Sequence, residues 1–141
     1  MKDHVARVER TIDAPIERVW TALTTTESHS AMMFGSTVQT DWTVGGPITW
    51  SGVWEGKPFT DRGEIVALEP PTRFEVTHFS PLSGEDDSPE HYHTIEWRLE
   101  EQGGRTLVRL AQDNNSSQEA AEHSAQNWAA SLEQLAKVVA G

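Results

Sequence analysis

Apolar and polar residues follow two different periods along this chain. Between positions 37 and 112 they alternate, and positions 4–12 alternate in the same way. A period of two is typical of strands with one buried face. In the segments between and after these regions, apolar residues recur every three or four positions, which indicates helices with one buried face. The pattern therefore predicts a set of strands framed by helices.

Glycine and proline clusters divide the alternating region into six strands. A helix with Pro15 in its first turn is predicted to end near Thr25. A second short helix or turn is predicted at residues 27–34, which end in the apolar cluster Met32, Met33 and Phe34. The acidic segment 81–89 is predicted to be a mobile loop. The seven predicted strands are 4–12, 37–43, 48–54, 59–68, 72–80, 91–101 and 105–112.

The last segment, Ser116–Gly141, predicts one long amphipathic helix. Ser116 and Glu119 have the spacing of a capping box, in which a hydroxyl and a later carboxylate bond the first free amides. Lys137 lies near the other end, where its charge suits the helix dipole. The predicted buried face consists of Ala121, Ala125, Trp128, Leu132, Leu135 and Val139.

Strands joined by short turns pair as antiparallel neighbours, so the strands predict one sheet. Such a sheet has a face to bury, and only the C-terminal helix is long enough to cover it. We therefore expect an α+β fold in a single domain over residues 1–141, in which a curved antiparallel sheet of about seven strands wraps around that helix. Two short helices connect the first two strands. Because a curved sheet and a helix do not fit closely everywhere, a cavity is expected between them.

Composition narrows the classes of function. The chain has no cysteine, which excludes disulfides, thiolate catalysis and cysteine-ligated metal. Its net charge of −11 argues against nucleic acid or an anionic membrane as a partner. No segment reaches the roughly 18 apolar residues of a membrane span, and the N-terminus has no apolar run. A soluble cytoplasmic protein is expected.

Several sequence motifs occur along the chain, namely Val8–Trp20 ("VERTIDAPIERVW"), Leu23-Thr24, Gly45-Gly46, Gly63-Glu64-Ile65, Leu68-Glu69-Pro70, Arg73-Phe74 and Gly104-Arg105-Thr106. Together they resemble the START-like, or SRPBCC, helix-grip superfamily, which includes Bet v 1-like proteins. The branch is that of homologues of the activator of heat shock protein 90 ATPase. Ser30–Phe34 departs from the Trp-rich segment usual in the branch, so the pocket mouth is expected to differ.

The resemblance implies a cavity between the sheet and the C-terminal helix, and family members bind lipids, polyketides and other apolar molecules. Strand parity indicates which side chains face this cavity. Large aromatic side chains among them also suit an ordinary core, and the two histidines also suit backbone partners. The predicted ligand-binding residues are Trp50, Trp54, Phe74, His78, His93, Trp97, Gln112, Ala125 and Trp128.

The histidines also raise the question of a metal site or a catalytic site. His91 and His93 are expected on one face of their strand, but Glu96 falls on the other, so the strand itself lacks a third ligand. His78 on a neighbouring strand leaves a three-histidine site open. No carboxylate is expected on the inner face with the histidines, unless Glu55 or Glu64 contributes one. No metal, cofactor or catalytic residue is predicted.

Three functions remain open from the sequence. The first is binding of a small hydrophobic or aromatic ligand, with a polar end of the cavity formed by His78, His93 and Gln112. The second, implied by the resemblance, is an interaction module that acts on a chaperone. The third is an enzyme of the cyclase or hydratase type with His78 or His93 as acid or base, although no residue demands catalysis. The protein is expected to be a monomer or a weak homodimer.

Overall fold

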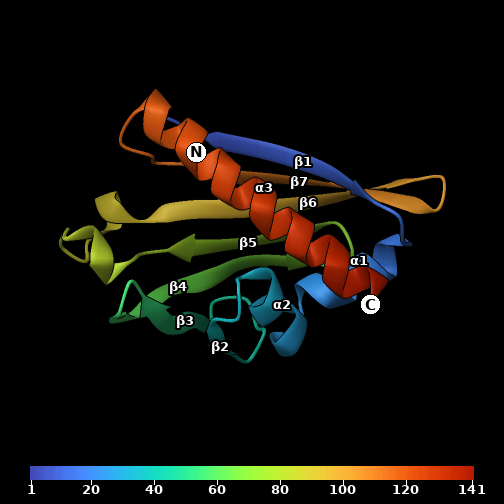
Figure 1. The fold of residues 1–141 in the computed structure, drawn as a ribbon, viewed down its shortest axis with the longest axis horizontal. Coiled ribbons are helices and arrows are strands. Elements are labelled where there is room, and N and C mark those ends of the chain that lie inside the picture. Colours follow the sequence, from blue (N-terminus) through green and yellow to red (C-terminus); the bar gives the residue numbers. More distant parts are fainter.

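The computed structural model describes residues 1–141 as a seven-stranded antiparallel sheet with a long helix across one face (Figure 1). The predicted fold class is confirmed, including the two short helices between the first two strands. The strands are β1 Ala6–Ile12, β2 Thr37–Thr40, β3 Pro47–Trp54, β4 Lys57–Glu69, β5 Arg73–His78, β6 His93–Gln102 and β7 Arg105–Gln112. The helices are α1 Ile16–Leu23, α2 Thr26–Met32 and α3 Gln118–Ala140, with short 3-10 turns at Pro81–Ser83 and Pro89–His91.

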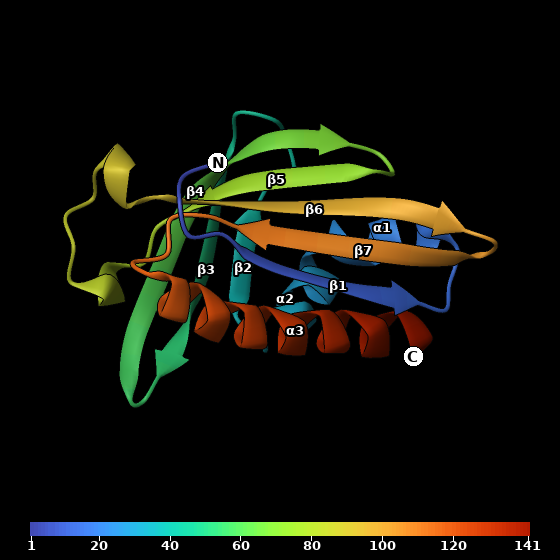
Figure 2. The same cartoon turned by 90° about the horizontal axis from the view of Figure 1, so that it is seen from above.

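The sheet order is β1-β7-β6-β5-β4-β3-β2, so only β1 leaves the order of the chain to pair with β7. The sheet bends strongly at β4, and Figure 2 shows β2, β3 and the start of β4 at a steep angle to the other strands. A register shift lies between Ile65 and Ala67. Near this bend a Cβ on Gly63 would lie 1.7 Å from the Thr77 carbonyl oxygen, so the close approach of β4 to β5 requires glycine.

Helix α3 crosses the inner face of this curved sheet. Its N-cap is Ser117, whose hydroxyl accepts a hydrogen bond from the amide of Ala120 at 3.0 Å. The capping box predicted from Ser116 is therefore wrong by one residue, because Ser117 has the extended backbone of a cap and bonds the amide three residues on. None of the helices combines the length and apolar character needed to cross a membrane.

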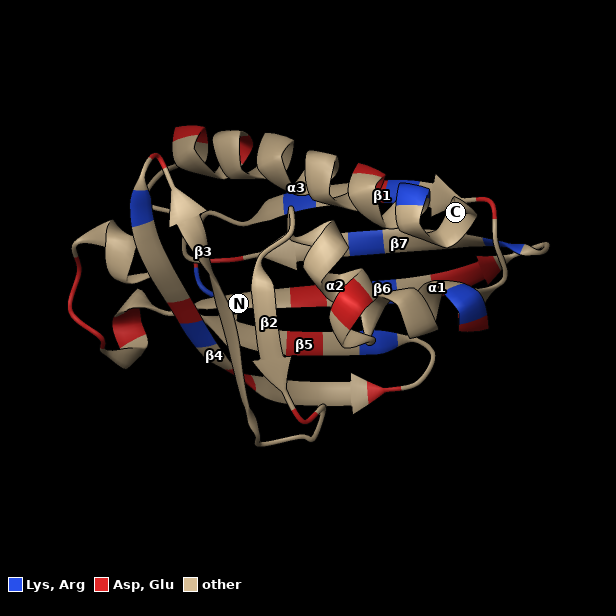
Figure 3. Ribbon diagram, turned by 60° about the horizontal axis from the view of Figure 1, so that its bottom comes forward, with Lys and Arg blue, Asp and Glu red and all other residues tan.

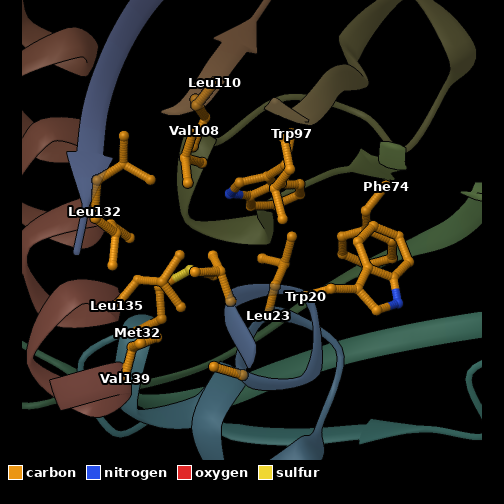
Figure 4. Close-up of a cluster of buried hydrophobic side chains, with 14 of the residues drawn as sticks. Trp20, Leu23, Met32, Phe74, Trp97, Val108, Leu110, Leu132, Leu135 and Val139 are labelled. Carbon is orange, nitrogen blue, oxygen red and sulfur yellow. The ribbon is translucent and has the colours of Figure 1, made fainter. Parts of the chain in front are cut away.

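The core lies where α1, α2 and the C-terminal half of α3 meet the sheet. Figure 4 shows its side chains converging from both layers, and most are completely buried. Met32 belongs to this cluster, whereas Phe34, expected beside it, is exposed because the chain turns outward after α2. The labelled members of the cluster are Trp20, Leu23, Met32, Phe74, Trp97, Val108, Leu110, Leu132, Leu135 and Val139.

The outer face of the sheet is charged. Figure 3 shows positions of both signs along β4 to β7. Arg73 lies 2.8 Å from both Glu75 and Glu96, and these carboxylates raise the pKa of its guanidinium. Because these side chains alternate with the core residues along the same strands, the outer face is the polar half of the period-two pattern.

Candidate functional site

The two halves of α3 differ in how deeply their side chains are buried. In its C-terminal half Ser131, Leu132, Leu135 and Val139 are buried, but in its N-terminal half only Ala121 is. That N-terminal half lies beside β1 and the end of β7, at the left of Figure 1. We call this region the open end of the grip, and define it by five side chains. They are Asp61, His78, His93, Gln112 and Trp128.

The central contact of the open end is a hydrogen bond between Asp61 Oδ2 and His78 Nε2, at 2.9 Å. Asp61 lies on β4 opposite Trp50, and the Trp50 ring lies 5.3 Å from the His78 ring. The expectation that only Glu55 or Glu64 could bring a carboxylate to the histidines is therefore wrong. Asp61 shares the inner face of β4 with Ile65, because the two are four residues apart.

The second histidine lies directly beside the first. His93 is paired with His78 across β5 and β6, and their rings are 5.9 Å apart. His93 Nδ1 lies 2.9 Å from the backbone oxygen of Asp113. Burial lowers the pKa of His93, and the neighbouring His78 lowers it further, against the opposing effect of the Asp113 carbonyl. His93 is therefore held as a neutral imidazole near pH 7.

Gln112 and Trp128 connect this polar cluster to the helix. The Trp128 indole donates a hydrogen bond from Nε1 to Gln112 Oε1 at 2.9 Å. One turn earlier on α3, the Ser124 hydroxyl donates to Asn115 Oδ1 at 2.7 Å. The N-terminal half of α3 is thus attached to the end of β7 mainly by hydrogen bonds between side chains. Ala125, between these two contacts, is half-buried.

Two clefts border the cluster, and they share no lining residue. One, of about 330 Å³, lies beside the start of α3 and is polar, with His93, Gln112 and Ser124 in its wall and Glu85 and Glu90 on its rim. The other, of about 290 Å³, is apolar and lies at the tip of the β3–β4 hairpin. Its lining consists of Trp54, Phe59 and Leu82, together with Asp61.

Buried polar atoms without a partner mark the same region. Asp61 Oδ1 and His78 Nδ1 are buried and have no hydrogen-bond partner in the protein, and the same is true of Trp97 Nε1 deeper along β6. A buried polar group without a partner costs roughly 1–3 kcal/mol, so most such groups in a protein are satisfied. Two of the three belong to the single pair Asp61–His78, in which each side chain is about one-sixth exposed. This concentration makes the Asp61–His78 pair the polar centre of the candidate site.

Other predicted ligand residues lie in the core. Trp50, Phe74 and Trp97 are almost completely buried, and Phe74 stacks on Trp97 with 5.2 Å between ring centres. Trp54 lies on the same face of β3 as Trp50 but is 62% exposed, because the hairpin extends beyond the cover of α3. The predicted residues are thus divided between a filled core and the open end.

The sequence analysis missed His29, which is fully buried in α2 among the aromatic side chains. Its Nδ1 lies 2.9 Å from the Leu23 carbonyl oxygen, and its Nε2 accepts from the Trp50 indole at 3.0 Å. Burial lowers its pKa to about 4, against a smaller opposing effect of the Leu23 carbonyl. His29 is therefore a neutral structural residue that satisfies Trp50.

His91 lies outside the histidine pair. It was expected on the inner face of a strand that begins at residue 91, but β6 begins at His93, and His91 ends a 3-10 turn. Its ring nitrogens lie 2.6 Å from the Asp86 backbone oxygen and 3.2 Å from Glu85. No three His, Asp or Glu side chains are arranged to hold a metal ion.

The largest surface groove, of about 470 Å³, lies elsewhere, mainly on the outer face of β1, β7 and β6. Several of its charged side chains are paired with one another, as in the contact of 3.3 Å between Arg109 and Glu9 and that of 3.0 Å between Arg98 and Glu96. None of the unpartnered buried atoms lies on its lining. We therefore place the candidate site at the open end.

A long helix gripped by a curved antiparallel sheet defines the START-like class of proteins. Within that class, the profile described as "Activator of Hsp90 ATPase homolog 1-like protein" matches residues 13–140. The chain belongs to this family. A search of the curated proteins found no match.

Three solved structures illustrate the similarity. ChR145 from Cytophaga hutchinsonii is 39% identical, with a TM-score of 0.85 over 99% of this chain and 96% of that one. The Aha1 dimer from Colwellia psychrerythraea is 20% identical, with a TM-score of 0.73 over 96% and 95%. Ara h 8.0201 is 14% identical, with a TM-score of 0.75 over 97% of each chain. The last two similarities concern the fold alone.

Proposed function

We propose that this protein binds a small apolar or aromatic molecule at the open end of the grip. The observation that carries the proposal is the apolar cleft of Trp54, Phe59 and Leu82, which is also lined by Asp61. The Asp61–His78 pair supplies two of the unpartnered buried atoms. An apolar wall that ends in a few convergent polar groups is the usual form of a small-molecule site.

The packing of α3 supports this placement. The packed end of the grip is filled by side chains such as Trp97, Phe74 and Leu135, which have no exposed surface. At the open end α3 presents the small Ala121 and Ala125, and a half-buried Trp128. A ligand that enters there has to displace fewer close contacts of α3, because its N-terminal half buries fewer side chains than its C-terminal half.

Native mass spectrometry of freshly purified protein, followed by a thermal-shift screen of apolar and aromatic compounds, tests the proposal. We expect a retained molecule, or a compound that raises the melting temperature. Trp54→Ala should weaken its binding by up to about tenfold, since the contact between two aromatic rings contributes about 0.5–1.5 kcal/mol. Val44→Ala is the matched control, because Val44 is an exposed apolar residue away from both clefts.

An empty protein that no compound stabilises would contradict ligand binding. Equal loss of binding in Trp54→Ala and Val44→Ala would place the ligand elsewhere. In the first case an interaction with a chaperone, which the family description suggests, becomes the leading function. Stimulation of a purified chaperone ATPase would then be the measurement.

Catalysis is a second candidate, favoured by the 2.9 Å contact between Asp61 and His78. A carboxylate beside an imidazole orients the ring and stabilises its protonated form, which is what a general base requires. His78 Nδ1 would take a proton from an acidic O–H or C–H bond of the ligand. If His78→Phe and His93→Phe both leave conversion of a bound ligand unchanged, the protein is a binder only.

A further inference from the structure

We infer that the ligand is a neutral aromatic molecule with hydroxyl groups, and that Asp61, His78 and His93 accept hydrogen bonds from those hydroxyls. The inference rests on the proposed function, because it names the chemical class that the open end would select. It follows from the positions of protons on the two histidines and from the charges around them.

The proton on His78 is placed by its partner. A carboxylate accepts hydrogen bonds and has none to donate, so His78 Nε2 carries the hydrogen in its contact with Asp61. In the neutral ring Nδ1 is then a lone-pair acceptor, and this atom is buried without a partner. The other oxygen of the same carboxylate, Asp61 Oδ1, is a second acceptor in the same state. With a neutral ring, the pair therefore offers two acceptors and no free donor.

The proton on His93 is placed in the same way. A backbone carbonyl only accepts, so His93 Nδ1 donates to the Asp113 oxygen at 2.9 Å. The lowered pKa of His93 keeps the ring neutral, which leaves Nε2 as a lone-pair acceptor. His93 lines the polar cleft, and its ring lies 5.9 Å from that of His78. His78 and His93 thus bring two acceptors close to each other on adjacent strands.

The charges around this region disfavour an anion. Neither cleft is lined by Lys or Arg, whereas Glu85 and Glu90 line one and Asp61 lines the other. Arg62, which lies nearby on β4, is paired with Asp87. A carboxylate or phosphate ligand would find no cation and would be repelled by these groups. A neutral hydroxyl supplies the donor that the acceptors lack without adding negative charge.

The rest of the ligand is indicated by the apolar cleft. Trp54, Phe59 and Leu82 form a wall that an aromatic ring can contact, and Asp61 lies at its boundary with the histidine pair. The ring of Trp50 lies 5.3 Å from that of His78 and gives the polar atoms an aromatic neighbour. An aromatic ring with a hydroxyl at one edge matches this change from apolar to acceptor surface.

Titration of the full chain with naphthalene, 2-naphthol and 2-naphthoate at pH 7.5, followed by NMR of the six tryptophan indole N–H signals, tests the inference. The three probes share one ring system and differ only in the polar group. We expect 2-naphthol to bind at least about fivefold more tightly than naphthalene, the effect of one neutral hydrogen bond. 2-Naphthoate should bind more weakly than either. The Trp54 signal should shift with 2-naphthol.

His78→Phe separates hydrogen bonding from apolar contact. It keeps a ring of similar size but removes the acceptor, so the preference for 2-naphthol over naphthalene should fall to about twofold or less, while naphthalene still binds. His123→Phe makes the same replacement at an exposed position of α3 outside both clefts, and should leave the preference unchanged.

Equal binding of naphthalene and 2-naphthol would overturn the inference while leaving the proposed function intact, because an apolar ligand would still bind. Tighter binding of 2-naphthoate would overturn it as well, since the site would then favour an anion. Failure of all three probes to bind would overturn both the inference and the proposal that the site binds aromatic molecules. The comparison of probes uses the unmodified protein, so it stands even if His78→Phe does not fold.

Discussion

The two halves of α3 differ in almost every respect although they belong to one continuous helix. The C-terminal half contributes Leu132, Leu135 and Val139 to a close-packed apolar core. The N-terminal half is attached through the hydrogen bonds Trp128–Gln112 and Ser124–Asn115, over a region that retains unpartnered polar atoms. One half stabilises the fold, and the other borders the proposed binding site.

The contrast has a physical basis in how the helix meets the sheet. Where α1 and α2 add a further layer, apolar side chains are enclosed from several sides, as Figure 4 shows. Beyond α2, α3 lies beside β1 (Figure 2), and Ser124, Ala125 and Trp128 remain partly exposed there. A site with unsatisfied polar groups costs stability, and the packed end offsets that cost.

The largest effect is expected from removing a side chain at the packed end. Leu135→Ala should lower the free energy of unfolding by about 4 kcal/mol, because Leu135 is completely buried and leaves a cavity. Ala125→Leu, in the half-buried face at the open end, should change it by about 1 kcal/mol or less. Urea denaturation of both variants measures the two values. Similar losses would show that the ends do not differ in packing.

A somewhat smaller effect is expected from the buried His29. Its pKa in the folded protein is about 4, below the ordinary 6.5, so between these pH values the unfolded chain takes up a proton that the folded protein does not. Stability is therefore complete above pH 6.5 and falls as the pH falls, by about 1.4 kcal/mol per pH unit and about 3 kcal/mol in total.

Denaturation of the unmodified protein and of His29→Gln between pH 4 and 7 measures this effect. Carboxylates that titrate in the same range contribute equally to both proteins, so the difference between the two isolates His29. The free energy of unfolding of His29→Gln should change less with pH than that of the unmodified protein. Parallel curves would contradict the assignment of His29 as a neutral residue of the packed end.

The smallest effect is expected at the open end itself. Trp128→Phe keeps an aromatic ring but removes the indole donor to Gln112, which should cost about 1 kcal/mol of the free energy of unfolding. Leu132→Val removes one carbon atom from a side chain one turn further along α3. It should lower the free energy of unfolding by about as much, through loss of packing alone. Gln112→Leu distinguishes loss of the hydrogen bond from loss of packing. In that background the effect of Trp128→Phe should be smaller, and the effect of Leu132→Val should be unchanged. Additive losses in Trp128→Phe and Gln112→Leu would show that the hydrogen bond contributes little.

Much of the candidate site could be predicted by counting along strands. His78, His93 and Gln112 were expected at one end of the inner face, and the structure places them together there. Asp61 obeys the same parity as Ile65 on β4, so counting along that strand would have found it. His29 offered no such signal, because α2 is only seven residues long and the direction of its buried face depends on what packs against it.

The sequence by itself determined the order of elements, the inner faces of the strands and the buried stripe of α3, because these depend on local periods of two and about three and a half residues. The tertiary structure alone decided where α3 stops covering the sheet. That position leaves Trp54 exposed while Trp50, four residues earlier on the same face, is buried. The tertiary structure also brings Asp61 on β4 to His78 on β5. Local periodicity carries no information on such distances, because they depend on the bend of β4 and on the angle at which the helix crosses the sheet.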